Sequence, residues 1–363
     1  MMAQASPTSV FLAGADVISV ENLKNQPAPV RQIQRPRQRS QYTLKIVWRN
    51  VIAFTILHLL AVYGFYRVMF YSKIQTILFT LLTGYLGGVG ITAGAHRLWA
   101  HRSYKAKWPL RLILMFFQTM AFQNHIYEWV RDHRVHHKFT DTDADPHNSK
   151  RGFFFSHMGW LMLRKHNDVM DKGKSVDMSD MEKDPVVMWQ KKYYELLVPI
   201  CTFILPTLVP YYAWNETFAT SFSAAIFRYV LSLNFTWLVN SAAHIWGMKP
   251  YDKNISAAEN HSVAVLTYGE GFHNYHHAFP WDYKAAELGN YSLNWSTAFI
   301  DLFAKIGWAY DMKIATHEIV AQRAKRTGDG SRFSENEVWG WDDQDMTDED
   351  KSLVRIINAQ KHE

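Results

Sequence analysis

Four long runs of apolar residues, separated by polar stretches, set the pattern of this chain. They cover residues 46–70, 74–95, 196–214 and 218–243, and short polar turns around Ser72 and Asn215 join them in pairs. A helix needs about 20 apolar residues to cross a bilayer, and each run meets or approaches that length. The pattern therefore predicts an all-α integral membrane protein whose four transmembrane helices form two hairpins.

Two of the predicted spans contain residues that disturb a membrane helix. The third holds Pro199, Pro206 and Pro210, and we expect a kink there because proline interrupts the helical hydrogen bonds. The fourth holds Arg228, whose charge is costly inside a bilayer. Its side chain should therefore face protein, water or the nearby interface.

Two further apolar stretches, residues 112–122 and 299–310, are too short to cross a bilayer. We expect both to lie on the membrane surface as amphipathic helices. The first is important for topology, because a crossing there would put His133 on the opposite side of the bilayer from His96.

The distribution of charge orients the hairpins. The net charge is +6 over 363 residues, and basic residues gather before the first run and after the second: Arg31, Arg35, Arg37, Arg39, Lys45 and Arg49, then Arg97, Arg102, Lys105, Lys107 and Arg111. The positive-inside rule then predicts both termini and a helical cap in the cytosol. We expect a disordered basic tail over residues 1–43, a membrane domain with its cap over 44–328, and an acidic tail over 329–363.

Composition excludes several classes of protein. Cys201 is the single cysteine, so no intramolecular disulfide is expected. The basic residues border apolar runs instead of forming a separate patch, so no nucleic-acid partner is expected. The N-terminal region has no basic segment followed by an apolar core, so no cleaved signal peptide is predicted.

Three short segments are crowded with histidine and hold eight of the 17 in the chain. They are His96-Arg-Leu-Trp-Ala-His101, His133-Arg-Val-His136-His137 and His273-Asn-Tyr-His276-His277. Neutral imidazole is the commonest metal ligand and suits iron, zinc and copper. Because eight ligands are too many for one ion, the pattern predicts a site for two metals in the cap.

Helical spacing explains two of these segments. Positions i, i+3 and i+4 share one face of an α-helix, so each H-x-x-H-H segment presents three imidazoles together. His96 and His101 would diverge by about 140° on an unbroken α-helix. We therefore expect the helix to end near His96, with a turn that brings His101 back. His244, four residues after Asn240, is a ninth candidate ligand.

In these motifs the sequence resembles the membrane-bound acyl-CoA desaturases of the stearoyl-CoA desaturase group, especially their insect members. The similarity runs from about residue 47 to 328, and it is carried by residues 90–101, 124–137, 145–149, 240–244 and 269–277.

The resemblance implies an enzyme of the endoplasmic reticulum that uses O2 to insert a cis double bond into a saturated long-chain acyl-CoA. It implies two Fe ions, with electrons from cytochrome b5 and NADH-cytochrome b5 reductase, and four transmembrane helices in a mushroom shape under a cytosolic cap. The implied iron ligands are nine histidines, with Asn240 acting through a water: His96, His101, His133, His136, His137, His244, His273, His276 and His277.

The resemblance also implies two sets of substrate contacts. Gln123, Trp129 and Thr236 would line the bend of an acyl tunnel. Arginine and lysine are the expected partners of CoA phosphates, although ordinary interfacial charge is the simpler interpretation. The set implied for the CoA end is Asn50, Asn124, Arg131, Asp132, Arg164, Lys165 and Trp237.

Several other residues keep two interpretations. Gly84, Gly87 and Gly88 share one face of the second span, where they allow either close helix packing or room for the far end of the acyl chain. Glu128 and Asp132 are candidates to orient metal-binding histidines, and for Glu128 the alternative is a plain surface role. We expect His58 to be a buried, hydrogen-bonded core histidine that binds no metal.

The remaining alternatives concern the reaction. A Δ9 double bond is expected, with Δ11 or another position, as in insect pheromone synthesis, as the alternative. A di-iron membrane hydroxylase would add a hydroxyl group instead. A front-end desaturase is disfavoured because the third cluster begins with His273, where many such enzymes carry glutamine. A metal transporter is disfavoured because the clusters lie outside the spans. The pattern leaves open whether the chain forms a homo-oligomer.

Overall fold

The computed structural model describes residues 44–287 and 291–332, together with positions 348 and 352. The basic tail predicted for residues 1–43 lies outside the described residues. Most of the predicted acidic tail lies outside them as well.

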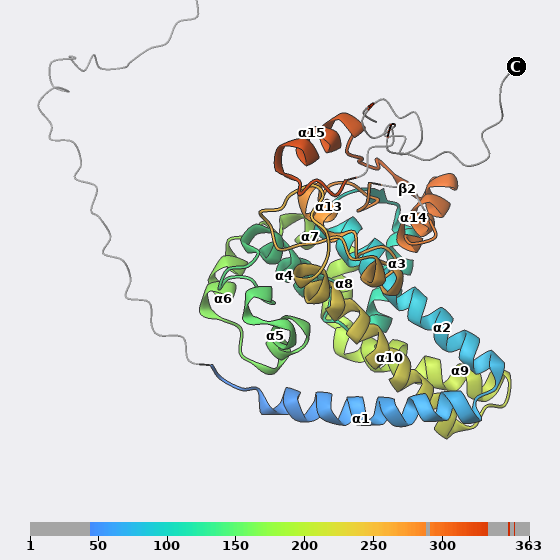
Figure 1. Cartoon of the computed structure of the whole chain (residues 1–363). Coiled ribbons are helices and arrows are strands. Elements are labelled where there is room, and N and C mark those ends of the chain that lie inside the picture. The colour runs from blue at the N-terminus through green and yellow to red at the C-terminus, as the bar shows by residue number, and fades with distance from the viewer. Residues whose placement is uncertain (1–43, 288–290, 333–347, 349–351, 353–363) are drawn as a thin grey trace, which may run out of the picture. The chain divides into compact units, whose positions relative to one another are not determined.

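Four helical stretches in the described chain are long and apolar enough to cross a membrane: Trp48–Tyr71, Ile74–Ala100, Pro185–Ala213 and Phe218–Ile245. They confirm the predicted all-α membrane fold. In Figure 1, α1 (Trp48–Tyr71) is followed by a short turn and α2 (Ile74–Val89), and α9 (Leu205–Ala213) by a short turn and α10 (Phe218–Asn240). These are the two predicted hairpins.

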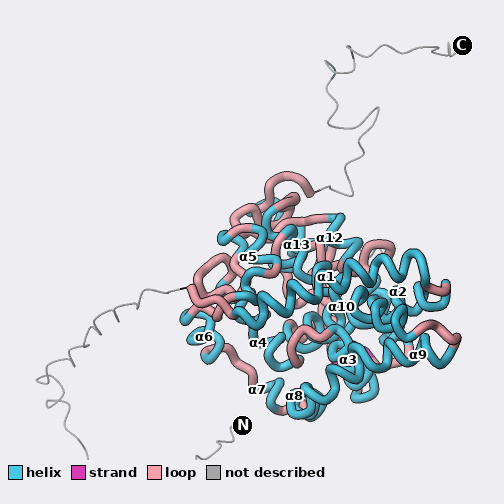
Figure 2. Tube along the Cα trace, turned by 90° about the horizontal axis from the view of Figure 1, so that it is seen from below, coloured by secondary structure: helices cyan, strands magenta, loops and turns pink. Residues whose placement is uncertain are grey.

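Short helices and connecting loops make up the rest of the described chain, drawn in cyan and pink in Figure 2. Strands β1 (Lys105–Ala106) and β2 (Ala309–Tyr310) form one antiparallel pair. The elements other than α1, α2, α9 and α10 are a π-helix at Gly90–Ala100, β1 (Lys105–Ala106), α3 (Trp108–Ala121), α4 (Ile126–Phe139), a 3-10 turn at Ser149–Arg151, α5 (Phe153–His157), a 3-10 turn at Gly159–Met162, α6 (Asn167–Lys174), α7 (Ser179–Glu182), α8 (Pro185–Val198), a π-helix at Pro199–Ile204, α11 (Ala242–Ile245), α12 (His261–Leu266), α13 (His273–Ala278), α14 (Trp295–Lys305), β2 (Ala309–Tyr310) and α15 (His317–Thr327).

Two spans differ in extent from their predictions. The second does not end near His96, because it continues as a π-helix to Ala100 and is capped by His101. The third begins at Pro185, since α8 leads through a π-helical segment into α9. The π-helical segment begins at Pro199. In place of the predicted kink, the helix therefore changes from α-helical to π-helical hydrogen bonding at this proline.

Arg228 faces protein, as predicted. Its side chain is 2% exposed, and its two terminal nitrogens donate to the backbone carbonyls of Met120, at 3.3 Å, and Thr202, at 2.9 Å. Pro206, four residues after Thr202, has no N–H for that carbonyl. Met120 lies in the last turn of α3, where helical carbonyls lack partners within the helix. The guanidinium therefore donates to two backbone carbonyls that lack their usual partner within the helix.

The apolar stretch at residues 112–122 forms most of α3. This helix buries Leu110 and Leu114 and exposes Trp108, Leu112 and Phe116. The stretch predicted at residues 299–310 is helical only as far as Lys305, the end of α14, and Ala309–Tyr310 form strand β2. Helices α3 and α14 are amphipathic, as predicted, and their location on a membrane surface stays a prediction.

A buried carboxylate joins the turns of the two hairpins. Glu216 is 3% exposed, and it accepts hydrogen bonds from the Lys73 backbone N–H at 2.9 Å and the Thr76 hydroxyl at 2.7 Å. The same Thr76 hydroxyl accepts from the indole N–H of Trp214 at 2.8 Å. The ammonium of Lys73 donates to the backbone carbonyls of Trp214 and Asn215. This network holds the start of α2 against the second hairpin.

We predict that Glu216→Gln lowers the stability of the protein. The amide keeps the size of the carboxylate but turns an N–H group toward buried donors, which costs about 1–3 kcal/mol. The midpoint of thermal unfolding, measured in detergent by the loss of the monodisperse peak, should fall. Glu195→Gln is the matched control, because Glu195 is exposed on α8. Equal midpoints for the two variants would contradict this account.

Candidate metal centre

Nine histidines from four elements meet in two groups. One group contains His96, His101, His133, His137 and His276, and the other contains His136, His244, His273 and His277. Within each group, one nitrogen of every ring lies within 4.8 Å of the others. All eight histidines of the three motifs are included, and so is His244. The structure therefore brings together all the histidines that the sequence singled out as ligands.

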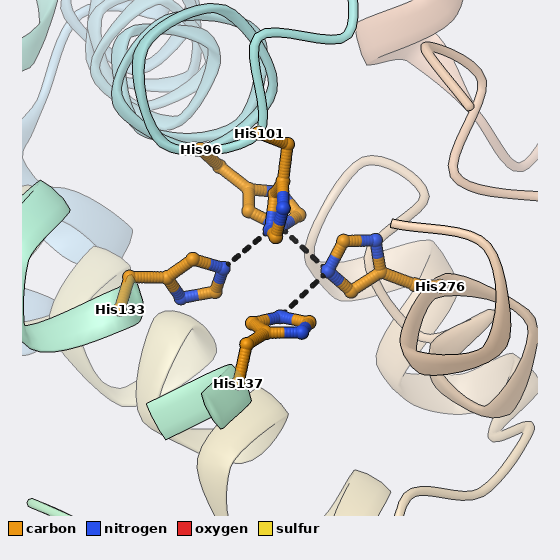
Figure 3. A group of neighbouring side chains, drawn as sticks. All are labelled: His96, His101, His133, His137 and His276. Carbon is orange, nitrogen blue, oxygen red and sulfur yellow. Dashed lines mark hydrogen bonds between the residues drawn. The ribbon is translucent and has the colours of Figure 1, made fainter. Parts of the chain in front are cut away.

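The first group draws on three elements. Figure 3 shows His96 and His101 reaching in from the end of the second span, His133 and His137 from α4, and His276 from α13. Their Nε2 atoms point at one another, with separations of 2.9 Å between His96 and His276, 2.8 Å between His101 and His133, and 3.0 Å between His276 and His137.

The π-helix explains how His96 and His101 reach the same point. In a π-helix each backbone N–H donates to the carbonyl five residues earlier. Here the N–H of His101 donates to the carbonyl of His96 at 3.1 Å. Residues five apart are therefore stacked on one face, and the two ring centroids lie 4.9 Å apart. The predicted turn is replaced by a wider helical turn.

The second group lies directly beside the first. The Nε2 atom of His273 is 2.9 Å from that of His244 and 3.2 Å from that of His277. The rings of His137 and His277, one from each group, stack with centroids 4.1 Å apart. Helices α4 and α13 each contribute to both groups. In each helix the histidines at i and i+4 point to one group and the histidine at i+3 points to the other.

Polar partners on the outer ring nitrogens orient three of these histidines. The Nδ1 atom of His96 lies 2.7 Å from the carboxylate of Glu270, that of His136 lies 2.9 Å from Asp145, and that of His244 lies 2.8 Å from the Ser256 hydroxyl. A partner that accepts from Nδ1–H leaves the lone pair on Nε2, which is the nitrogen directed into the group.

Electrostatics favour uncharged rings. Burial, followed by the neighbouring imidazoles, lowers the pKa of His101, His133, His137, His276 and His277 well below the ordinary value, and it lowers that of His273 to about 3. Burial by itself would raise the pKa of Glu270, but Arg97 and His96 lower it to about 2. These six rings are thus neutral donors, and the Glu270 carboxylate behind the first group stays ionised.

This donor set fits metal ions. Neutral, converging imidazole nitrogens with anionic partners behind them are typical of protein metal sites, and imidazole suits iron, copper, zinc and nickel. The groups of five and four histidines match two adjacent ions. A third, smaller group of His136, Asp145 and His147 shares His136 with the second and supports it from outside.

Two small cavities lead to the histidines from the second span. The first, of about 30 Å³, is lined by Gly84, Gly88, Ile91, Thr92, Ser232, Phe235, Thr236, Val239, Leu266, Thr267 and Tyr268. The second, of about 40 Å³, is lined by Ile91, Thr92, His96, Trp129, His133, His136, Thr236, Val239, Asn240, Glu270 and His273. The cavities share four wall residues and therefore adjoin, and together we call them the acyl path, after the acyl tunnel that the resemblance implies.

The three residues implied for the tunnel bend lie on or beside this path. Thr236 lines both cavities and accepts a hydrogen bond from the Gln123 amide at 2.9 Å. Trp129 lines the second cavity, and its ring stacks on His133 with centroids 4.9 Å apart. Asn240 lines the same cavity, beside the second group of histidines.

The glycines of the second span differ in their surroundings. A Cβ at Gly88 would lie 2.2 Å from the Tyr268 ring, so this glycine allows close packing. A Cβ would make only ordinary contacts at Gly87, 3.7 Å from the Ala121 backbone, and at Gly84, 3.6 Å from the Arg228 side chain and 3.9 Å from Ser232. Of these two glycines, Gly84 is the one that lines the first cavity.

Most residues implied for the CoA end form one region where the start of α1 meets residues 161–165. The Asn50 amide donates to the carbonyl of Leu161 at 2.7 Å, and the N–H of Arg164 bonds the carbonyl of Lys45. Lys165 and Arg131 pair with Asp132 at 2.5 and 3.3 Å. Two of the set lie elsewhere: Trp237 is buried beside Phe54 and His157, and Asn124 is in the turn before α4.

The acidic residues that contact the clustered histidines differ from those expected. Glu128 and Asp132 pair with Lys165, so they do not orient the histidines. The carboxylates that orient histidines are instead those of Glu270, on His96, and Asp145, on His136. The sequence does not indicate the Glu270 contact, because His96 is distant from it in the chain. His58 is hydrogen-bonded, as predicted, to the carbonyl of Phe54 and to Asn234, but it is half-buried.

Comparison with known proteins gives consistent matches. A family model described as fatty acid desaturase matches residues 72–286. The chain is 59% identical over 347 residues to an acyl-CoA Delta-9 desaturase of Acheta domesticus, covering 95% of each chain. It is 58% identical over 318 residues to an acyl-CoA Delta12-desaturase of the same organism, covering 87% of this chain and 88% of the relative. It is 53% identical over 317 residues to an acyl-CoA Delta(11) desaturase of Trichoplusia ni, covering 87% and 90%.

We predict that Asp145→Asn weakens metal binding by about 10- to 100-fold, because the neutral amide no longer stabilises the Nδ1–H of His136. The measurement is metal content per chain after dialysis against graded chelator, determined by mass spectrometry of the elements. Asp143→Asn is the matched control, since Asp143 is exposed in the same loop. Equal metal retention in both variants would show that Asp145 does not support the site.

Proposed function

The chain belongs to the fatty acid desaturase family, and we propose that it is the Δ9 member that inserts a cis double bond into a saturated long-chain acyl-CoA. The observation that carries this proposal is the acyl path, which leads from Gly84 to the two histidine groups. The reaction removes two hydrogens from neighbouring methylenes. With two electrons and two protons supplied from outside, O2 is reduced to two waters.

We propose two Fe ions as the metals. His96, His101, His133, His137 and His276 would hold one, and His136, His244, His273 and His277 would hold the other, with Asn240 acting through a water. When bound, the pair of irons supplies the O2 activation that an unactivated C–H bond requires. The all-nitrogen donor set and its carboxylate partners support this assignment.

The protein's own contribution is to fix the substrate and exclude water. Neighbouring methylenes are chemically equivalent, so the position of the double bond depends on where the chain is held along the path. Thr236 and Trp129 line the path where it approaches the histidines. Because both cavities are small, an acyl chain entering the path has to separate the side chains that close it.

We propose that the CoA end binds near the start of α1 and residues 161–165. Arg131, Arg164 and Lys165 supply cationic groups for phosphates. Asp132 lies between Arg131 and Lys165 and keeps their side chains in place. Asn50 borders this region through Leu161, and Asn124 and Trp237 belong to the same proposed set of contacts.

The electron source and location follow from the same proposal. Cytochrome b5, reduced by NADH-cytochrome b5 reductase, would deliver electrons on the cytosolic side of the endoplasmic reticulum membrane. Both termini would lie on that side. The support is the basic charge that borders the first hairpin, together with the gathering of all three histidine motifs at one end of the spans.

Sequence identity alone does not select the position of the double bond, because relatives named for positions 9, 12 and 11 are 59%, 58% and 53% identical to this chain. Expression in a desaturase-deficient yeast, followed by mass-spectrometric location of the double bond, tests it. A Δ9 product supports the proposal. A Δ11 or Δ12 product would refute the position alone, and a hydroxylated product would refute desaturation.

We predict that His136→Ala abolishes product and lowers iron content, since His136 belongs to the second group and is 3% exposed. Fatty acid analysis in the same yeast and iron determination on the purified protein are the measurements. His261→Ala is the control, because His261 is exposed and outside both groups. Product formation by the His136 variant at the control rate would overturn the ligand assignment.

We predict that Gly84→Leu shifts the preferred substrate to shorter chains, because the new side chain fills the end of the acyl path. The measurement is the ratio of C16 to shorter products. Leu81→Phe enlarges a side chain of the same helix that is 64% exposed and should leave this ratio unchanged. An unaltered product profile for Gly84→Leu would indicate that the glycine serves packing alone.

A further inference from the structure

A wide apolar groove lies on the outer surface, away from the acyl path. It is shallow and open to the outside, with a volume of about 480 Å³. None of its lining residues lines either cavity of the acyl path. Its walls come from α2, α3 and α14, and those used in the argument are Leu86, Ile113, Phe116, Phe299 and Phe303.

Two lysines lie where the start of α3 meets the end of α14, the two helices that form most of the walls of this groove. Lys107 directly precedes α3, and its ammonium lies 4.0 Å from where a Cβ on Gly307 would be, just beyond the end of α14. Lys305 is the last residue of α14. Both are exposed. The backbone N–H of Lys107 also bonds the carbonyl of Trp308 at 2.8 Å, which fixes this corner.

Neighbouring basic residues are already neutralised. Lys105 pairs with Asp311 at 2.8 Å, and Arg111 pairs with Asp184 at 2.9 Å. Among the ion pairs of the described residues, none involves Lys107 or Lys305. The positive charge at the mouth of the groove therefore has no carboxylate partner within that part of the chain.

The groove runs from the lysines toward the membrane span. Helices α3 and α14 are antiparallel here, since Lys107 meets the end of α14 while Phe117 contacts Phe299 near its start, with ring centroids 6.5 Å apart. Beyond that contact the wall is completed by Leu86 of α2. A ligand that fits has an anionic head at one end and a hydrocarbon chain at the other.

We propose that the groove between α3 and α14 binds one anionic phospholipid of the surrounding bilayer. The phosphate lies between Lys107 and Lys305, and one acyl chain lies against Ile113, Phe116 and Phe303. The exposed indole of Trp108, which follows Lys107 in the chain, suits the level of the headgroups. The proposal requires the membrane fold, and it does not depend on the position or chemistry of the double bond.

Native mass spectrometry of the full chain, released from detergent with equal amounts of dioleoyl phosphatidylserine and dioleoyl phosphatidylcholine, tests the proposal. The protein should retain one phosphatidylserine in preference to phosphatidylcholine. A lysine near an anionic phosphate contributes about fivefold, so the double variant Lys107→Gln, Lys305→Gln should lose on the order of 25-fold in preference. Lys105→Gln is the matched control, because Lys105 lies on the adjoining strand β1 and is paired.

A second variant tests the apolar part. Ile113→Trp narrows the groove and should reduce retention of both lipids while the lysines remain. Equal retention of the two lipids by the unaltered protein, or an unchanged preference in the double lysine variant, would overturn the proposal. Displacement of the retained lipid by stearoyl-CoA would assign the groove to substrate, and a dimer abolished by Ile113→Trp would assign it to a second copy of the chain.

Discussion

The uncharged state of the clustered imidazoles is the constraint on which this site depends. Rings whose centroids are 4–5 Å apart cannot all carry protons, because like charges at that distance repel strongly where water is excluded. Burial keeps them neutral, as the pKa of about 3 for His273 illustrates. The carboxylates of Glu270 and Asp145 face the outer nitrogens of His96 and His136, and this directs the lone pairs of these two rings inward.

The membrane helices serve this requirement by converging on one region. The second span delivers His96 and His101, and the fourth leads through a break at Ser241 to His244. The opposite ends of the hairpins are held by Glu216, and the irregular backbone between them is completed by Arg228. Polar side chains in the span region thus satisfy backbone groups that lipid cannot satisfy, while the path beside Gly84 stays apolar.

Much of this was predictable from local pattern. Apolar runs gave the four spans, and the i, i+3, i+4 spacing gave two histidine faces, because both depend on neighbouring residues. The extension of the third span to Pro185 was missed because its first turns contain Lys191 and Lys192, which are polar yet helical. The pairing of His96 with Glu270 and the different surroundings of Gly84 and Gly88 depend on contacts between distant segments, which composition does not reveal.

The π-helical end of the second span has a consequence for how this chain tolerates change in length. Losing one residue between Gly90 and Ala95 would rotate the residues beyond the deletion by about 100° relative to the rest of the span. His96 and His101 would then both turn away from the three histidines that complete their group. Surface loops can accept insertions and deletions, whereas this stretch has to keep its number of residues.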